Sequence, residues 1–315
     1  MLIAILGATS QIAKDLILGI VAAGGDDELF LYARQPTKVL SWLTSMEAAE
    51  RIHIAGYEDF GSADYDAIIN FVGVGDPARA VAMGVTIFDI TLQFDQLVLD
   101  YLRRHADCRY LFLSSGAVYG STFDEPVDEG TQALVAINNL KPGNWYGVSK
   151  LHAECRHRAL ADLPIIDLRV FSYFSRTQDL STHFLMSDVM RALLDGTVLR
   201  TSPDRIVRDY LHPDDFHALA RALLTSPPAN TSIDCYSAAP IDKLSLLEAI
   251  KKRFGLQYDF CQSMESENPA ELKFKYFSLS RRAENFGYHP TRTSLDGVLL
   301  EVAALLNLNV LYSNE

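Results

Sequence analysis

Short apolar runs alternate with helical patterns along the first half of this chain of 315 residues. The runs lie at residues 2–6, 29–33, 52–55, 67–72, 110–114 and 165–170, and the main helical patterns lie at about 11–23, 39–49, 87–104 and 146–161. Continuous apolar runs are typical of parallel strands that are buried on both faces. Their alternation with helices predicts an α/β fold built on a doubly wound parallel sheet.

The regular alternation loosens after residue 170, where we expect helices near 183–194, 214–224, 244–254 and 294–306 with shorter strands between them. A length of 315 residues suits about two domains. We expect residues 1–170 to form the sheet domain, completed by segments near 207–238. Residues 171–206 and 239–315 are expected to form a smaller, irregular α/β lobe.

The charge balance limits the partners of the chain. It carries 28 Lys and Arg against 40 Asp and Glu, a net charge of −12, and no compact basic run offsets it. We therefore expect no binding to nucleic acid, and a small anionic substrate must be bound by a local group of arginines. Four scattered cysteines without a CxxC pair are typical of reduced cytosolic thiols. Without a membrane-length apolar stretch or a signal peptide, we expect a cytoplasmic protein that binds no membrane.

A turn of small residues follows the first apolar run. In a parallel sheet such a turn places backbone N–H groups and a helix N-terminus against the pyrophosphate of a dinucleotide. Gly7 is present, but Ser10 stands where a glycine-rich fingerprint has its second glycine. An ordinary strand-to-helix turn is the alternative interpretation. If the turn binds a cofactor, its contacts are expected to be Gly7, Thr9, Ser10, Gln11 and Ile12.

The end of the second apolar run bears on the choice of cofactor. An acid at this position accepts hydrogen bonds from the ribose 2′-hydroxyl of NAD, whereas an arginine accommodates the 2′-phosphate of NADP. Residues 31–35 read Leu-Tyr-Ala-Arg-Gln, with Arg34 just past the run and no acid. This pattern favours NADP, with NAD still possible. The alternative is that Arg34 is only a solvated surface residue.

Tyr146 and Lys150 stand four residues apart in a predicted helix, so their side chains share one helix face. A phenol has an unperturbed pKa of about 10, but a nearby ammonium favours the phenolate and lowers that pKa. The same spacing also occurs by chance. Ser115 strengthens the interpretation, because it ends an apolar run at the carboxyl edge of the predicted sheet, where ligands bind. There it can hydrogen-bond the substrate oxygen that Tyr146 protonates.

Four segments in this order, residues 7–13, 114–120, 146–150 and 208–215, resemble the extended short-chain dehydrogenases/reductases. The chain is similar to their NAD-dependent epimerase/dehydratase family, which modifies nucleotide sugars, and the resemblance spans essentially the whole chain. It implies a Rossmann fold with the cofactor on the N-terminal sheet and a nucleotide-sugar substrate under the C-terminal lobe. It also implies a homodimer formed through helices that flank the sheet.

The resemblance implies roles for the three residues of the candidate catalytic group. Tyr146 would be the general acid/base. Lys150 would bind the nicotinamide ribose of the cofactor and lower the pKa of Tyr146. Ser115 would orient the substrate oxygen.

Three further positions follow from the same resemblance. Arg208 would contact the substrate diphosphate and supply positive charge that the acidic chain otherwise lacks. Ser172 stands where many relatives have a substrate-binding asparagine, and Gly73 belongs to a small-residue surface beside the cofactor. No metal site is expected, because the histidine pairs 152/157 and 212/217 are five residues apart, a rotation of about 500° on a helix.

The residues after the strand-end serine narrow the reaction. Relatives that dehydrate the sugar or decarboxylate UDP-glucuronate carry acids there, whereas this chain has Gly116 and Ala117, which cannot transfer a proton. Two reactions remain that need only Tyr146 and a cofactor. Arg34 favours 4-keto reduction with NADPH, and 4-epimerisation with tightly bound NAD is the alternative. A non-catalytic dinucleotide-binding scaffold or sensor is the third interpretation, favoured by Ser10.

Overall fold

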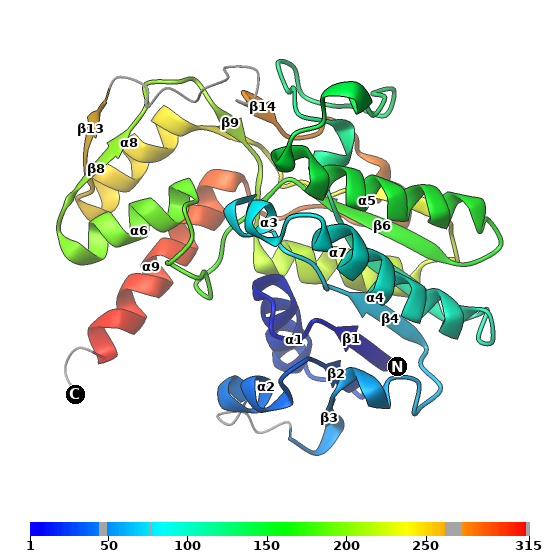
Figure 1. The fold of residues 1–315 in the computed structure, drawn as a ribbon. Coiled ribbons are helices and arrows are strands. Elements are labelled where there is room, and N and C mark those ends of the chain that lie inside the picture. Colours follow the sequence, from blue (N-terminus) through cyan, green and yellow to red (C-terminus); the bar gives the residue numbers. More distant parts are fainter. Residues whose placement is uncertain (44–48, 76, 262–272, 313–315) are drawn as a thin grey trace.

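Seven parallel strands form the central sheet of the computed structural model, which describes residues 1–43, 49–75, 77–261 and 273–312 (Figure 1). Their order across the sheet is β3-β2-β1-β4-β5-β6-β11. The strands are β1 (Leu2–Leu6), β2 (Glu28–Tyr32), β3 (Ile52–Ala55), β4 (Ala67–Asn70), β5 (Arg109–Ser115), β6 (Ile165–Val170) and β11 (Thr231–Asp234). The strand order reverses between β1 and β4, which is where doubly wound sheets bind ligands. The predicted fold class is confirmed.

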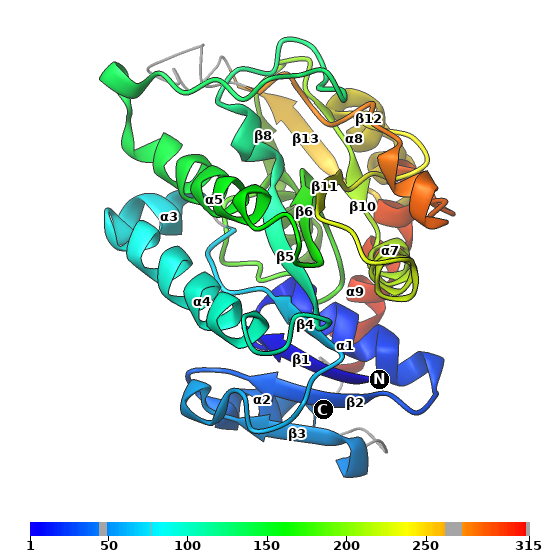
Figure 2. The same ribbon diagram turned by 90° about the vertical axis from the view of Figure 1, so that its right-hand side faces the viewer.

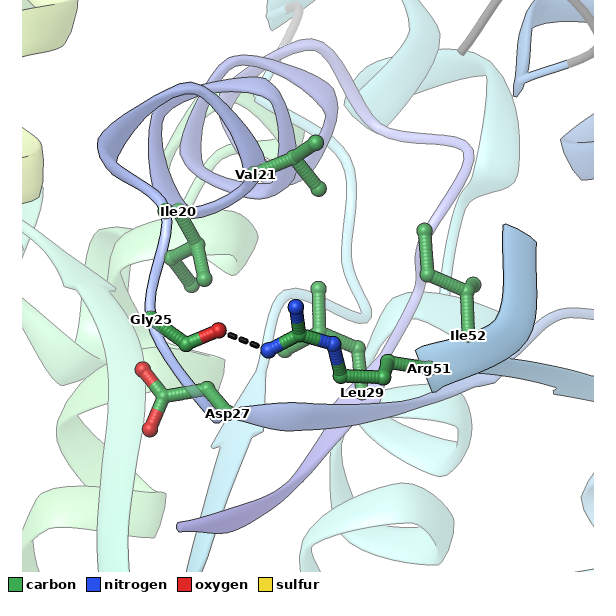
Figure 3. Close-up of a pocket in the computed structure, with 8 residues that line it drawn as sticks. Ile20, Val21, Gly25, Asp27, Leu29, Arg51 and Ile52 are labelled. Carbon is green, nitrogen blue, oxygen red and sulfur yellow. Dashed lines mark hydrogen bonds between the residues drawn. The ribbon is translucent and has the colours of Figure 1, made fainter. Parts of the chain in front are cut away.

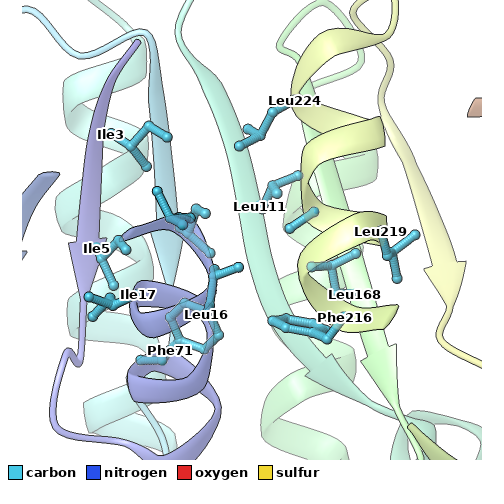
Figure 4. Close-up of a cluster of buried hydrophobic side chains, with 14 of the residues drawn as sticks. Ile3, Ile5, Leu16, Ile17, Phe71, Leu111, Leu168, Phe216, Leu219 and Leu224 are labelled. Carbon is cyan, nitrogen blue, oxygen red and sulfur yellow. The ribbon is translucent and has the colours of Figure 1, made fainter. Parts of the chain in front are cut away.

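Helices cover both faces of this sheet, with α4 and α5 on one side and α1 and α7 on the other (Figure 2). Their bounds are α1 (Gln11–Ala23), α2 (Pro36–Leu43), α3 (Pro77–Met83), α4 (Thr86–Leu102), α5 (Pro142–Ala159) and α7 (Pro213–Thr225). Successive strand residues face opposite sides. Ile3 and Ile5 therefore join a core with α1, α2 and α7 (Figure 4), whereas Ala4 and Leu6 join a core with α4 and α5.

A third apolar core lies in the C-terminal lobe, between α6 (Leu185–Asp195), α8 (Lys243–Phe254) and α9 (Ser294–Tyr312). Short strands complete this lobe: β8 (Val198–Thr201) with β13 (Gln257–Phe260), and β9 (Val207–Arg208) between β12 (Ile241–Asp242) and β14 (Lys275–Tyr276). β7 (Ser172–Tyr173) pairs with β10 (Tyr210–Leu211). Two later segments of the chain join the central sheet and its helices: helix α7 packs on α1, and strand β11 pairs with β6. The domain boundaries drawn from the sequence remain a prediction.

Several helices differ from their predicted bounds, and α9 extends to Tyr312 where the sequence predicted an end near residue 306. Helix α5 begins at Pro142 and not at residue 146, because proline suits the first turn, where no N–H partner is needed. The Asn144 side chain accepts a hydrogen bond from the Lys141 N–H at 3.0 Å and caps the same end. Tyr146 consequently lies in the second turn. The helix predicted at 39–49 is α2, which begins earlier and ends at Leu43, and residues 44–48 lie outside the described part.

Candidate active site

The turn between β1 and α1 has the geometry of a phosphate-binding turn. Gly7 has φ of +76°, and a Cβ there would lie 2.9 Å from the backbone carbon of Phe71, so only glycine fits without strain. Ser10 caps α1, because its Oγ accepts a hydrogen bond from the Ala13 N–H at 3.4 Å. The serine that replaces the expected glycine therefore begins the helix and keeps the helix N-terminus in place.

The other residues predicted to contact a cofactor at this turn are Thr9, Gln11 and Ile12, and their surroundings differ. Within the described residues, the backbone N–H groups of Gln11 and Ile12 donate to no protein acceptor, which fits a pyrophosphate at the helix N-terminus. Thr9 is exposed at the tip of the turn. The Gln11 side chain donates to Ser175 Oγ at 2.9 Å, which ties the turn to the C-terminal lobe.

Arg34 is exposed just after β2 and lies near a tyrosine that the sequence did not indicate. Burial raises the pKa of Tyr57, while a hydrogen bond from Gly7 and the charge of Arg34 act in the opposite direction. The Tyr57 ring centre also lies 4.4 Å from that of Phe94 on α4. Arg34 and Tyr57 thus flank the phosphate-binding turn at the carboxyl edge of the sheet.

Ser115 and Tyr146 lie together at the end of β5. Burial raises the pKa of Tyr146, and the hydrogen bond with Ser115 partly offsets this effect. Ser115 Oγ also accepts a hydrogen bond from the Ala117 N–H at 3.2 Å and lies 3.2 Å from the hydroxyl of Tyr276. Tyr276 comes from β14, in the C-terminal lobe, and no feature of the sequence pointed to it.

Gly147 allows this close approach of α5 to the strand end. A Cβ at Gly147 would lie 2.5 Å from the carbonyl oxygen of Ala117, which is too short for a contact between two non-bonded atoms. Glycine at this position lets the second turn of α5 pack directly on the short helix at Gly116–Tyr119. The neighbouring Tyr146 is thereby held beside Ser115.

The Lys150 side chain lies against β5, next to the same site. Its Nζ donates to the Leu113 carbonyl at 2.7 Å and stands 4.3 Å from the centre of the Phe112 ring. Burial lowers the pKa of Lys150 to about 8, against the charges of nearby carboxylates. A Cβ at Gly73 would lie 3.2 Å from Nζ, so the structure brings these two predicted cofactor contacts together.

The expected lowering of the Tyr146 pKa by Lys150 is not what the structure shows. The pKa of Tyr146 is raised, because burial outweighs the hydrogen bond with Ser115. The Lys150 ammonium donates to a backbone carbonyl, and its charge is not among the causes that shift the tyrosine.

A buried charged network supports the back of α5. His157 lies between two carboxylates, with Nδ1 2.6 Å from Asp167 and Nε2 2.7 Å from Asp95. Burial alone would lower the pKa of this histidine, but the two carboxylates outweigh it and raise the pKa to about 9. Arg169 pairs with Glu154 one turn away. The helix that carries Tyr146 and Lys150 is therefore fixed by buried ion pairs as well as by apolar packing.

The substrate residues predicted from the sequence lie on the C-terminal side of this site. Arg208 Nη1 donates to the carbonyl oxygens of Val207 at 2.9 Å and Lys273 at 2.6 Å, and its guanidinium carbon is 5.7 Å from the Tyr276 ring centre. Tyr276 thus lies between Arg208 and Ser115. Ser172 is half-buried in β7, next to Phe171.

These elements occur in the order and geometry of one protein family. The model of the NAD dependent epimerase/dehydratase family matches residues 3–237. The chain belongs to this family. The resemblance inferred from the sequence motifs is confirmed.

Several curated relatives of the chain are named UDP-glucose 4-epimerases. UDP-glucose 4-epimerase 2 of Oryza sativa subsp. japonica is 27% identical over 250 residues, which cover 71% of this chain and 59% of that protein. The UDP-glucose 4-epimerase of Streptococcus mutans is 27% identical over 214 residues, covering 61% of this chain and 62% of the relative. The chain thus matches about three fifths of the length of these relatives.

Solved structures of the family share the fold. UDP-glucuronic acid 4-epimerase from Bacillus cereus, in complex with UDP-glucuronic acid and NAD, gives a TM-score of 0.77 at 19% identity and covers 98% of this chain and 100% of its own. dTDP-glucose 4,6-dehydratase from Bacillus anthracis, in complex with NAD, gives 0.77 at 16% identity and covers 96% of both chains.

One position separates this family member from relatives with an acid after the strand-end serine. A Cβ at Gly116 would lie 2.4 Å from ring carbons of Phe171. The site therefore lacks not only the acid but also the space for a longer side chain at this position. The Phe171 ring packs instead against Tyr276, with ring centres 5.1 Å apart.

A hollow elsewhere on the sheet contributes nothing to this site (Figure 3). It lies at the amino ends of β2 and β3, where Arg51 donates to the Gly25 carbonyl and lies 3.4 Å from Asp26. Ligands of doubly wound sheets bind at the opposite, carboxyl edge. Among the described residues, no group of three His, Cys, Asp or Glu is arranged to hold a metal ion. In that same part of the chain, no helix is long and apolar enough to cross a membrane.

Proposed function

We propose that this protein is an NAD(P)-dependent enzyme that interconverts the C4 epimers of a nucleotide-linked sugar. The observation that carries the proposal is the meeting of Ser115 and Tyr146 above Lys150, with no proton-transferring side chain at Gly116 or Ala117. Epimerisation at C4 needs one acid–base group and a hydride carrier. The curated relatives named UDP-glucose 4-epimerase support the same choice.

The residues present fit a dinucleotide cofactor. Gly7 leaves no side chain between the turn and a pyrophosphate, and the free N–H groups at the start of α1 point to an anion. Gly73 and Lys150 would hold the nicotinamide ribose. When bound, a nicotinamide would supply the hydride chemistry at C4 of the sugar.

The chain itself would move the proton. Tyr146 takes the proton of the C4 hydroxyl as the ketone forms and returns it when the hydroxyl is restored, so no net proton is consumed. Ser115 hydrogen-bonds the same oxygen and favours the phenolate of Tyr146. Because burial raises the pKa of Tyr146, the hydrogen bond with Ser115 is the contact that stabilises its phenolate during turnover. Arg208 would contact the substrate diphosphate.

Reduction of a 4-keto sugar by NADPH is the second candidate, and Arg34 is the observation that favours it. Arg34 is exposed at the carboxyl edge of β2, where a 2′-phosphate would lie, and no acid stands in residues 31–35. The solved structures that bind NAD favour the epimerase.

The homodimer and the cytoplasmic location implied by the sequence stay predictions. Light scattering tests whether the protein is a homodimer.

Product analysis tests the proposal. The purified protein is incubated with NAD or NADP and with UDP-glucose, UDP-N-acetylglucosamine or UDP-glucuronic acid, and the C4 epimers are separated by chromatography. We expect one pair to interconvert, Tyr146→Phe to lose at least about 100-fold in rate, and the half-buried Tyr258→Phe, in the C-terminal lobe, to match the wild type. A parallel assay supplies a nucleotide-linked 4-keto sugar with NADPH, and turnover only in that assay would favour the reductase. No turnover by the wild type on any substrate would contradict both and favour a scaffold.

A further inference from the structure

Two cations approach the ring of Tyr276. Lys273 Nζ lies 4.3 Å from the ring centre, and the Arg208 guanidinium carbon lies 5.7 Å from it. Arg208 also donates to the backbone carbonyl of Lys273 at 2.6 Å, which fixes the two residues relative to each other. The hydroxyl of the same tyrosine reaches Ser115. Lys273 is thus brought to the candidate active site, although no sequence motif indicates a role for it.

This pair of cations has no carboxylate partner among the residues that the structure describes. The Lys273 ammonium contacts the rings of Phe123 and Tyr276 instead. Burial, and then the charge of Arg208, lowers the pKa of Lys273 to about 8. Burial likewise lowers the pKa of Arg208. Aromatic faces compensate only part of the cost of burying two like charges together.

Three other basic side chains among the described residues pair with carboxylates. Arg169 contacts Glu154 at 2.5 Å, Arg176 contacts Glu301 at 2.6 Å, and Lys275 contacts Glu125 at 2.6 Å. Lys275 is two residues from Lys273 on the same segment, yet it has a carboxylate partner. The lack of such a partner for Lys273 among the described residues therefore reflects where its own side chain lies, not the segment that carries it. A buried cation pair that the described protein does not neutralise has the electrostatics of an anion-binding site.

The position of Lys273 connects that charge to the reaction centre. Lys273 lines a hollow together with Ala117 and Gly147, the two residues that hold the strand-end serine and Tyr146 in contact. Among the lining residues that the structure describes, Lys273 is the only charged one. An anionic group bound by Lys273 would therefore lie next to the residues that act on the sugar.

We propose that Lys273 is a substrate-binding residue that acts with Arg208 to bind an anionic oxygen group of the substrate. The inference rests on the proposed nucleotide-sugar substrate. The group is either a phosphoryl of the nucleoside diphosphate or a carboxylate on the sugar, because both offer the same charged acceptor oxygens. Of the groups considered within the described part of the chain, only this anionic substrate group would neutralise the cation pair.

Binding measurements with three probes test this proposal. Dissociation constants of UDP, UDP-glucose and UDP-glucuronic acid are measured by calorimetry for the wild type, Lys273→Gln and the control Lys275→Gln. Loss of one charge-assisted hydrogen bond should weaken binding about 10- to 100-fold in Lys273→Gln. Lys275→Gln makes the same charge change on an exposed ion pair and should bind as the wild type does. Lys273→Arg should restore part of the affinity.

The pattern across probes identifies the group. Weaker binding of all three ligands supports a phosphoryl contact, and weaker binding of UDP-glucuronic acid alone supports a carboxylate contact. Without ligand, the Tm of Lys273→Gln should equal or exceed that of the wild type, because the variant loses a charge buried beside Arg208. Wild-type affinity of Lys273→Gln for all three probes would overturn the inference and leave the proposed function intact. Failure of the wild type to bind any probe would overturn both.

Discussion

The hydroxyl of Ser115 lies 3.2 Å from the hydroxyl of Tyr276, a residue 161 positions later in the chain. The first belongs to the central sheet and the second to the C-terminal lobe. The candidate active site is therefore completed only when the two parts of the chain pack together. The orientation of the serine hydroxyl depends on both of them.

Removing the Tyr276 hydroxyl should impair catalysis through Ser115. We expect Tyr276→Phe to lower kcat/KM about 5- to 10-fold, the effect of one neutral hydrogen bond of about 1 kcal/mol. In a Ser115→Ala background, the same substitution should have little further effect, because its partner is already gone. Steady-state kinetics of the four proteins measure the coupling. Equal losses in both backgrounds would contradict a role through the serine.

Two glycines of α5 offer a matched test of close packing. Gly147→Ala places a Cβ 2.5 Å from the Ala117 carbonyl, and we expect it to cost about 1–3 kcal/mol of unfolding free energy. Gly143→Ala has nothing within 4 Å of its new Cβ and should be neutral or stabilising by up to about 1 kcal/mol. Urea denaturation gives both values. Equal stability of the two variants would refute the packing argument.

The buried His157 should make stability depend on pH. Burial lowers its pKa, but Asp167 and Asp95 outweigh that effect and raise the pKa to about 9, above the unfolded value of about 6.5. The charged imidazole therefore stabilises the fold below pH about 6.5, and this contribution is lost as pH rises through 9, by up to about 3 kcal/mol.

Urea denaturation at several pH values between 6 and 10 measures this loss, and His157→Gln is the comparison. The pKa of the buried Lys150 is lowered to about 8, so its titration acts in the opposite direction and is present in both proteins. The wild type should therefore lose more stability than the variant across this range. Parallel pH profiles would show that His157 is not charged in the folded protein.

The fold and half of the site follow from local sequence patterns. The apolar runs predict the strands because a parallel sheet buries both faces of each strand. The turn at Gly7 and the spacing of Tyr146 and Lys150 are visible because each depends on residues close together in the chain. The same logic explains the confirmed family resemblance, since each of its motifs is a short run of neighbouring residues.

The other half of the site depends on contacts between distant segments. Tyr276 and Lys273 reach the site only through the pairing of β14 with β9, and Tyr57 reaches the phosphate-binding turn from the segment after β3. No spacing rule in the sequence indicates such contacts. The direction of the Tyr146 pKa shift also depends on tertiary burial, which the helix spacing of Tyr146 and Lys150 does not report.

Arg34 should discriminate between the two cofactors if it contacts a 2′-phosphate. Arg34→Ala is then expected to raise the Kd for NADPH about 10-fold or more, with less than about a twofold change for NADH. Arg51→Ala is the control, because Arg51 lies at the amino edge of the sheet, in the hollow of Figure 3. Fluorescence titrations of the wild type and the two variants with NADPH and NADH give the six constants. Equal losses for NADPH and NADH would remove the argument for NADP.

The fate of the hydrogen at C4 tests the proposed function most directly. The wild-type protein is incubated with UDP-glucose deuterated at C4, and the products are analysed by NMR and mass spectrometry. If Tyr146 moves only the hydroxyl proton and the C4 hydrogen is taken and returned as hydride, UDP-galactose will form with deuterium retained at C4. Formation of the epimer with deuterium lost to solvent would contradict this account.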